Sequence, residues 1–456
     1  MCCTMENKII PDLSPQTFEV LPRLTLTVCT TDRFKVGKLR VRAMLRNTNE
    51  LIAPCALLLP VLHRGTREYP TQERINRYLD DLYATDCHIC NSTVGDLRIF
   101  GFASNMIESS FLPDGERLLP AIISLIVQLF FSPTTEADGK LIDRYVESER
   151  RHLIDAIESL SNHPASYAMT RFRAAFSHGR DTGKPIRVAQ LKAVGENDLR
   201  ALLQKIREQA HFHVFYIGQT PPDALICRLR CEFAPLLGEG ASQVTNACVK
   251  TYQPRRTPFC VTESLEVGQS HLILGYRTDI TITSPAFYAM MLCNELLGGN
   301  PSSRLFVHLR ERQSLCYSCQ SEYVLDRGEL IVSCGIDRSC RQAAQAEIEA
   351  QITALQQGTF DDAELEAARR LLLGGYAQIE DSTRAITSFY QVRQLLGISE
   401  NIRDCCRAFM QVTREQVIAA ARSLVLDTVY FLDGTLAGKE QEGEVAQESE
   451  VIDDGL

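Results

Sequence analysis

Apolar and polar residues alternate along several short stretches of the first half of the chain, and between them apolar residues recur at helical spacing. Alternation predicts strands, and apolar residues three or four positions apart predict helices. The predicted strands of this half cover residues 24–28, 38–45, 88–102 and 211–217. The predicted helices cover residues 54–62, 71–83, 116–160 (broken around residues 132–133) and 196–209.

The second half of the sequence repeats this order of elements. A strand is predicted at 270–276, followed by helices at 286–297 and 303–313, a hairpin that turns at Gly328, and helices at 341–357, 361–374 and 383–396. The spacing supports a repeat, because 234 residues separate Tyr83 from Tyr317 and 233 separate Gly95 from Gly328. We therefore predict an α+β fold with two homologous domains, each a mostly antiparallel sheet backed by helices.

Loop-forming residues divide the two halves. Pro and Gly are concentrated in the segment 218–257, which is typical of a linker around one short helix. The predicted domains are residues 1–217 and 258–436, joined by the linker 218–257. Residues 437–456 form a predicted disordered tail, because residues 439–456 contain seven acidic residues and one lysine.

The composition narrows the function classes. The formal net charge is −9, of which the tail supplies −6, so the body has no basic excess of the kind that nucleic-acid binding requires. Seventeen cysteines are scattered through apolar stretches, and the first residues have no basic-then-apolar pattern of a signal peptide. Reduced thiols in a cytoplasmic protein are the better interpretation. The longest apolar run, residues 118–131, is too short to span a bilayer.

One segment carries a specific resemblance. Residues 297–318 read LGGNPSSRLFVHLRERQSLCYS, and this string resembles the second-domain signature of the insulinase/pitrilysin superfamily of zinc peptidases. The resemblance extends over about residues 20–435 in the order of elements. It implies that the two domains are the halves of a peptidase clamshell.

The resemblance also locates the zinc motif that such peptidases carry. In the family the motif is His-x-x-Glu-His on one helix of the first domain, where two imidazoles bind zinc and the glutamate activates water. Counting back from Arg64-Gly-Thr66 places the three motif positions on Ala56, Leu59 and Pro60. None of these side chains can bind zinc or activate water, and Pro60 also removes a helical N–H. A further acidic ligand would come from residues 147–155.

The second-domain residues of the family pattern are present. Arg310 and Tyr317 stand seven residues apart, as the Arg/Tyr pair does in the family, where the pair hydrogen-bonds the substrate near the scissile bond. A guanidinium offers fixed donors, and a phenol stabilises developing negative charge. The resemblance further implies that Gly298 and Gly299 form a turn that faces the substrate. The interpretation without function is a surface ion pair for Arg310 and a packed strand residue for Tyr317.

These residues predict a division of labour between two chains. In some family members one subunit carries the zinc motif and the other keeps only the Arg/Tyr pair. We therefore predict a non-catalytic subunit of a heterodimeric, cytoplasmic zinc metallopeptidase, which binds no cofactor itself and is not an enzyme on its own. It would enclose peptides and supply Arg310 and Tyr317 to the zinc site of a homologous partner, with no role in nucleic-acid or membrane binding. The alternative is a catalytically silent structural or peptide-binding chamber protein of the same fold.

Other chemical signals in the sequence have simpler explanations. The pairs Cys87/Cys90 and Cys316/Cys319 are expected at the starts of strands, where residues three apart point to opposite faces, so we expect packed thiols instead of a metal or redox site. His211 and His213 share one face of a strand, but no third ligand is identifiable. A pair of packed histidines is the better interpretation.

Overall fold

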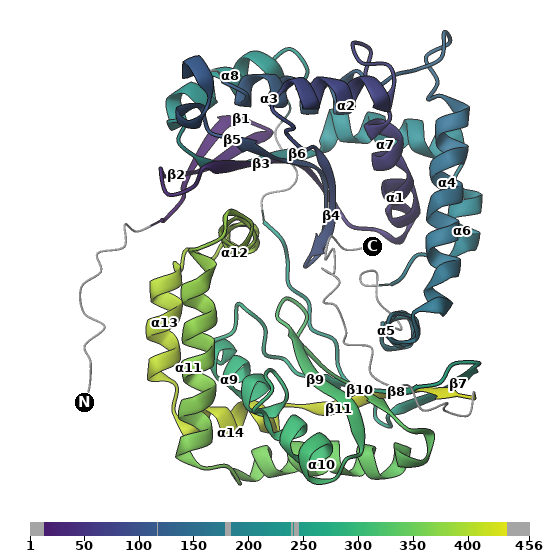
Figure 1. Ribbon diagram of the computed structural model, residues 1–456, viewed down its shortest axis with the longest axis vertical. Coiled ribbons are helices and arrows are strands. Elements are labelled where there is room, and N and C mark those ends of the chain that lie inside the picture. The colour runs from purple at the N-terminus through teal and green to yellow at the C-terminus, as the bar shows by residue number, and fades with distance from the viewer. Residues whose placement is uncertain (1–12, 116, 178–183, 239, 241–245, 436–456) are drawn as a thin grey trace.

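Two mixed β-sheets organise the chain, one in each half of the sequence (Figure 1). The computed structural model describes residues 13–115, 117–177, 184–238, 240 and 246–435. The first sheet contains β1 (Gln16–Leu21), β2 (Leu24–Thr30), β3 (Val36–Arg46), β4 (His88–Val94), β5 (Leu97–Ile107) and β6 (His211–Gly218). The second contains β7 (Phe259–Leu265), β8 (Ser270–Arg277), β9 (Cys316–Val324), β10 (Glu329–Ile336) and β11 (Val425–Gly434).

The two sheets share one topology. The first has the strand order β1-β2-β6-β3-β5-β4 and the second β7-β11-β8-β10-β9, so removing β1 makes the orders equivalent. Each sheet has one parallel pair, β2 with β6 and β7 with β11, and its other pairs are antiparallel. The predicted fold class, α+β with two mostly antiparallel sheets backed by helices, is confirmed.

Most of the helices pack on one face of each sheet, where they enclose its hydrophobic core. The first half contributes α1 (Asn49–His63), α2 (Gln72–Asp81), α3 (Leu119–Phe131), α4 (Asp143–Glu158), α5 (Pro164–Phe176), α6 (Val188–Ala193), α7 (Glu196–Gln209) and α8 (Pro222–Phe233). The second half contributes α9 (Phe287–Leu297), the π-helical segment η4 (Phe306–Arg312), α10 (Arg341–Gln357), α11 (Asp362–Ile379), α12 (Thr383–Leu395), α13 (Ile402–Gln411) and α14 (Arg414–Arg422). None of the described helices combines the length and apolar character that a membrane crossing requires.

Two helices cross between the halves, as Figure 1 shows. Helix α5 follows the elements of the first half but packs on the second sheet, where Phe172 and Phe176 contact Ile273 and Tyr430. Helix α12 belongs to the second half but packs on β3 and β6 of the first sheet. We call the face that α12 covers in the first sheet, and that α5 covers in the second, the inner face of that sheet. The exchange of helices ties the two halves together through apolar burial.

The predicted linker, the predicted tail and the predicted strands can each be compared with the structure. Helix α8 lies within the predicted linker 218–257, and its Leu225, Leu229 and Phe233 belong to the first core. The domain limits stay a prediction, and the predicted acidic tail, 437–456, lies outside the described residues. Strands β1, β7 and β11 have no counterpart among the predicted elements.

The predicted repeat holds for one of its two landmarks. Gly95 and Gly328 each lie in a hairpin turn with a positive φ, 54° and 61°, which glycine adopts without strain. Tyr83 and Tyr317 are not equivalent, because Tyr83 precedes β4 whereas Tyr317 lies inside β9. The equal spacing of the two tyrosines is therefore a coincidence, since the loops before the two hairpins differ in length.

Candidate functional site

The helix that would hold the zinc motif is α1, and it is an apolar core helix. Ala56 and Leu59 are 5% and 1% exposed, and Leu59 packs in the first core. Pro60 stands inside the helix. None of the three has a donor atom for a metal, so the residues present do not fit a zinc ion. Among the described residues, no group of three or more His, Cys, Asp or Glu could hold a metal.

The segment predicted to hold the further acidic ligand forms an ion pair with α1's C-terminal cap. Glu149 of α4 lies 2.9 Å from Nε of Arg64. The same guanidinium donates to Ser148 Oγ at 2.9 Å and to Gln72 Oε1 at 2.8 Å. His152 Nδ1 is 3.6 Å from the other carboxylate oxygen of Glu149. An arginine of the chain itself thus neutralises this carboxylate.

Arg310 lies exposed on η4. Leu309, the preceding residue, is fully buried and anchors the segment, which packs against β9. The Arg310 guanidinium stacks over the ring of Phe306, 4.8 Å from its centroid. Within the described part of the chain, no acidic side chain is ion-paired with it. Its N–H donors are therefore available to an external acceptor.

Tyr317 is displayed by a β-bulge. In the pairing of β9 with β10, Ser318 lies opposite Gly335 and Cys316 opposite Ile336, so Tyr317 is the extra residue. Its side chain is 60% exposed. The hydroxyl donates to the two carboxylate oxygens of Asp337, at 3.2 and 3.3 Å. The hydrogen bond to Asp337 and the charge of that carboxylate raise the pKa of Tyr317, so the phenol stays protonated and can donate.

The structure gives Arg310 and Tyr317 different partners and does not bond them to each other. They lie on adjoining elements, because η4 runs directly into β9 and packs on it. Both side chains are exposed, which is unlike the packed strand tyrosine of the alternative interpretation. Their role toward a substrate stays a prediction.

Gly298 and Gly299 close the end of α9 against β9. The backbone N–H of Ser321 donates to Gly298 O at 2.9 Å, and a Cβ on Gly298 would lie only 2.8 Å from that nitrogen. Gly299 is exposed, and a Cβ there would lie 2.6 Å from Glu295 Oε2. Close packing alone requires glycine at 298. The predicted contact of these two residues with substrate stays a prediction.

The prediction for the second Cys-x-x-Cys pair is wrong in its geometry. The bulge at Tyr317 turns Cys316 and Cys319 to the same buried face, where both are 8% exposed, and Cys334 of β10 lies opposite Cys319. The hydrogen bond from Cys319 and burial raise the pKa of Cys316. Buried thiols with a raised pKa are unreactive, so the interpretation of this pair as packed thiols, without a metal or redox role, still applies.

The other two signals agree with the simpler interpretation. Cys87 packs in the first core, whereas Cys90 lies on the inner face. His211 and His213 bond through Nε2 to Thr25 and Thr27, at 2.7 and 3.0 Å. Burial lowers the pKa of His211 to about 4 and that of His213 to about 3, so both rings are neutral.

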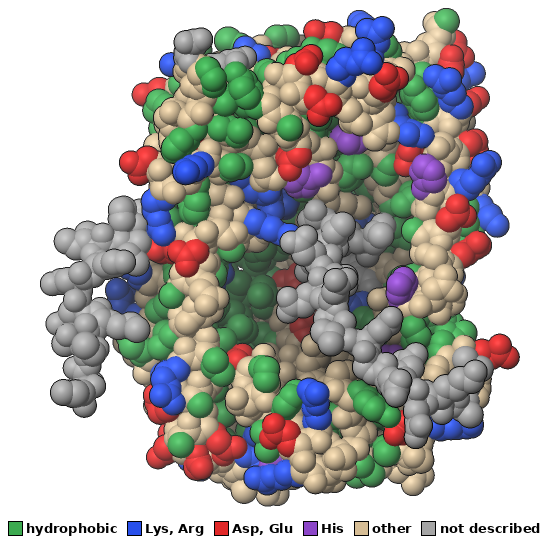
Figure 2. Space-filling model, viewed as in Figure 1, with side chains coloured by type: hydrophobic (Ala, Val, Ile, Leu, Met, Phe, Trp, Pro, Cys, Tyr) green, Lys and Arg blue, Asp and Glu red, His purple; other side chains and the backbone are tan. Residues whose placement is uncertain are grey.

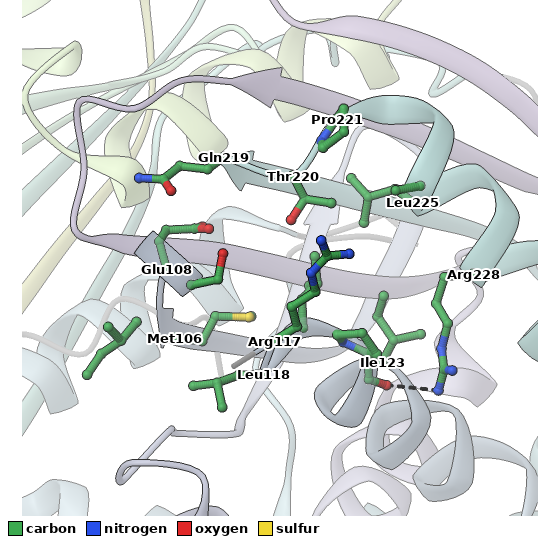
Figure 3. Close-up of a pocket in the computed structure, with 15 residues that line it drawn as sticks. Met106, Glu108, Arg117, Leu118, Ile123, Gln219, Thr220, Pro221, Leu225 and Arg228 are labelled. Atoms are coloured by element: carbon green, nitrogen blue, oxygen red, sulfur yellow. Dashed lines mark hydrogen bonds between the residues drawn. The ribbon is translucent and has the colours of Figure 1, made fainter. Parts of the chain in front are cut away.

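A cavity of about 360 Å³ lies in the first half, at the starts of α3 and α8 (Figure 3). Arg117 extends into it, and Arg228 at its edge donates to Pro120 O at 3.0 Å. On the far side, Glu108 is 5% exposed and accepts from the Tyr216 hydroxyl at 2.8 Å. None of the predicted site residues lines this cavity. It is therefore separate from the Arg310 and Tyr317 region.

Sequence reasoning missed a row of cations on β3. Lys38, Arg40 and Arg42 alternate with Leu39 and Val41, and the cations all point to the inner face of the first sheet. The alternation was visible in the sequence as Lys-Leu-Arg-Val-Arg, although a cation at every second position usually marks a solvated face. The structure buries all three.

Comparisons with known proteins add an independent line of evidence. The family model described as "Peptidase M16 inactive domain" matches residues 193–372. The chain is 25% identical over 414 residues to the "Probable inactive metalloprotease YmfF" of Bacillus subtilis (strain 168), a match that covers 90% of this chain and 96% of that protein. The matched domain is described as an inactive domain, and the matched relative as a probable inactive metalloprotease.

Solved structures share the fold over almost the whole chain. A conserved protein from Enterococcus faecalis V583 has a TM-score of 0.83 at 23% identity, covering 93% of this chain and 100% of that chain. The peptidase M16 inactive domain from Pseudomonas fluorescens has a TM-score of 0.74 at 16% identity, covering 94% and 100%. At these identities the structural likeness shows the fold alone.

Proposed function

Because this chain belongs to the M16, or insulinase, family of peptidases, we propose that it is the non-catalytic subunit of a heterodimeric zinc metallopeptidase. In this proposal it encloses peptides and supplies Arg310 and Tyr317 to the zinc site of a homologous partner. One contrast carries the proposal. The zinc-motif positions on α1 are apolar, with Ala56 and Leu59 buried and Pro60 half-buried, whereas Arg310 and Tyr317 are both exposed.

The two side chains fit complementary tasks at a peptide bond. The Arg310 guanidinium presents several N–H donors in a fixed plane, which suits a substrate carbonyl or carboxylate. The protonated Tyr317 hydroxyl can leave Asp337 and donate to an oxygen on which negative charge develops. Asp337 holds the phenol in place until a substrate arrives. This chain binds and orients the peptide in the proposal, and the partner supplies the metal.

The test is hydrolysis by a reconstituted pair, made from this chain and a relative that carries the zinc motif. Tyr317→Phe keeps the ring and removes the donor, so we expect kcat to fall about 100-fold, the scale for one lost oxyanion donor. Arg310→Gln is expected to raise KM and lower kcat. Arg312→Gln is the matched control, because Arg312 is an exposed arginine of the same segment.

Two results would contradict the proposal. Full activity of the pair with both Arg310 and Tyr317 replaced would show that these side chains do not act on the substrate. An equal loss with the Arg312 control would show that the effect comes from the fold of η4 and not from a contact with substrate. If the two chains associate and no activity appears, the structural or peptide-binding chamber protein is the better account.

A further inference from the structure

Strand β3 has two unlike faces. Leu39 and Val41 pack in the first core, and both are fully buried. Lys38, Arg40 and Arg42 point the other way, to the inner face, and are 4%, 5% and 8% exposed. Three consecutive inward positions on a central strand therefore carry a positive charge. Buried cations are unfavourable unless an anion compensates them.

The described residues provide little compensation for the charges of Lys38 and Arg42. Arg42 has no hydrogen bond and no ion pair among the described residues, and its Nε is buried without a partner. Lys38 donates to the neutral Asn105 Oδ1 at 3.0 Å, and no carboxylate is ion-paired with it in the described chain. Asp86, an acid whose charge acts on Lys38, is already hydrogen-bonded to Asn105 and lies 3.7 Å from His88.

The charges on β3 shift the pKa values of neighbouring groups. Burial and the adjacent Arg40 lower the pKa of Lys38 to about 8. Burial alone would raise the pKa of Cys90, yet the hydrogen bond from His88 and the charges of Arg42 and Arg40 lower it. A thiol two strands away thus experiences a positive field from β3. The same field would favour a bound carboxylate.

The strand beside this row carries small side chains. On β5, Gly101 lies opposite Arg42 and Ala103 lies opposite Arg40, so no large side chain of β5 stands beside these two arginines on the inner face. Helix α12 covers the other side of the row, where Arg40 donates to Gln391 Oε1 at 3.3 Å. Figure 2 shows the surface hollowed between the two halves, with Lys and Arg side chains at its upper edge.

We propose that Lys38 and Arg42 form an anion-recognition site that binds the acidic side chains of an enclosed peptide. The proposal deepens the proposed function, since it rests on the chain enclosing a peptide, and it names acidic peptides as the substrate class. The recessed position of both cations favours this ligand. An aspartate or glutamate of an extended peptide can reach them, whereas the phosphates of a nucleic-acid duplex need an exposed basic surface.

The test measures peptide binding to the full chain alone, by fluorescence anisotropy. One labelled peptide alternates Glu with apolar residues, and its partner has Gln at every Glu position. We expect the acidic peptide to bind at least about tenfold more tightly, with an advantage that falls as salt is added. Arg42→Gln and Lys38→Gln should each remove most of that advantage. Arg74→Gln, an exposed arginine on α2, is the control and should leave it unchanged.

Several outcomes would overturn the proposal. Equal affinity for the two peptides would mean that no acid-selective site exists, and an unchanged preference in Arg42→Gln would place that site elsewhere. Equally tight binding of single-stranded DNA would indicate a general polyanion surface. Acidic-peptide binding that appears only after removal of residues 437–456 would make the chain's own acidic tail the occupant.

This binding test is independent of the proposed function. It uses neither a partner nor hydrolysis, so a reconstituted pair that stays inactive does not affect its outcome. The converse result is hydrolysis by the pair that depends on Arg310 and Tyr317, while the chain shows no preference for acidic peptides. That result would overturn the proposed substrate class and leave the proposed function intact. Arg42→Gln is expected to fold, because no partner of Arg42 loses an interaction. Circular dichroism of each variant checks this point.

Discussion

Strands β3 and β8 hold the same position in the two sheets, and each carries a buried arginine. The two arginines differ in whether a carboxylate of the described chain pairs with them. Arg277 of β8 is 4% exposed and lies 2.8 Å from Asp427 and 3.6 Å from Glu329. Arg42 of β3 is 8% exposed and has neither kind of partner among the described residues. The buried arginine of β8 thus serves structure in the second half. In the first half we assign the buried arginine of β3 to binding.

Helices α5 and α12, which cover the inner faces of the two sheets, also differ in the side chains that they place there. Helix α5 places the aromatic rings of Phe172 and Phe176 on the second sheet and excludes water from it. Beside its apolar contacts, α12 places amide side chains on the first sheet, where Gln394 accepts from Thr27 at 2.7 Å and Gln391 contacts His213 at 3.4 Å. A hydrogen bond of such a side chain can be replaced by one to water or to a ligand, whereas an apolar contact has no such replacement.

The largest effect is expected at the compensated arginine. Asp427→Asn would remove the negative charge that Arg277 faces in a buried site, and it would also weaken the pairing with Arg255, which donates to Asp427 at 2.9 Å. We expect the free energy of unfolding to fall by about 3–5 kcal/mol, measured by urea denaturation. A loss no larger than that of the control below would mean that this ion cluster is not structural.

The control for this variant is Asp362→Asn. Asp362 pairs with Arg414 at 3.0 Å, but its side chain is 88% exposed. A pair in water contributes about 0–1 kcal/mol, so the same chemical change should have little effect there.

The pH dependence of stability sharpens the comparison at Lys38. Burial, and after it the charge of Arg40, lowers the pKa of Lys38 from 10.5 to about 8. As the pH rises, the Lys38 ammonium group therefore loses its proton at a lower pH in the native chain than in the unfolded chain. The cost of burying the charge is fully present below pH 8 and disappears as the pH rises from about 8 to 10.5. Relative to Lys38→Met, the wild-type chain should therefore gain roughly 1–3 kcal/mol across that window.

Urea denaturation of both proteins across the same pH window measures this difference. Subtraction is needed because other groups titrate there, such as His88, whose pKa is raised to about 9 mainly by its hydrogen bond to Asp86. A flat difference curve would show that Lys38 bears no buried charge, and it would weaken the contrast between the halves.

A smaller effect is expected where α5 meets the second sheet. A Cβ on Gly275 would lie 2.6 Å from the Phe172 ring and 2.8 Å from the Phe176 ring. Gly275→Ala should destabilise the chain by about 1–2 kcal/mol, as overpacking does. Gly374→Ala is the matched control, because a Cβ there meets nothing within 4 Å on α11. It should stabilise by about 0.5–1 kcal/mol, and thermal unfolding of both variants separates the two signs.

The smallest effect is expected at Arg42. Because no described residue pairs with it, Arg42→Gln should change the free energy of unfolding by less than about 0.5 kcal/mol, or stabilise the chain. Urea denaturation of this variant beside Asp427→Asn measures the contrast directly. A loss comparable to that of Asp427→Asn would show that Arg42 also has a structural role.

The sequence predicted much of the fold because the spacing of apolar residues and the glycines of turns are local signals. Alternation located β3, the glycine of each hairpin turn located Gly95 and Gly328, and the counted motif positions located Ala56 on α1. It missed β11, whose central position gives a continuous apolar run instead of alternation, and β7, an edge strand with weak patterning. The crossing of α5 and α12 depends on contacts distant in sequence, which no local pattern encodes.

The candidate site was predictable in its residues but not in its geometry. The resemblance identified Arg310 and Tyr317, yet not the bulge that exposes Tyr317 and turns Cys316 and Cys319 to one face. A one-residue insertion in a strand shifts every following side chain to the other face, so spacing alone misplaced the two cysteines. The importance of Arg42 was hidden for another reason, because a missing counter-charge is a property of the folded environment.

Titration of this chain into a fixed amount of its zinc-bearing relative tests the central claim most directly. Peptide hydrolysis and bound zinc are measured for each protein alone and at every mixing ratio. The account predicts that activity appears on mixing, saturates at equimolar chains and leaves the zinc on the relative. Hydrolysis by this chain alone with stoichiometric zinc, or no gain on mixing, would contradict it.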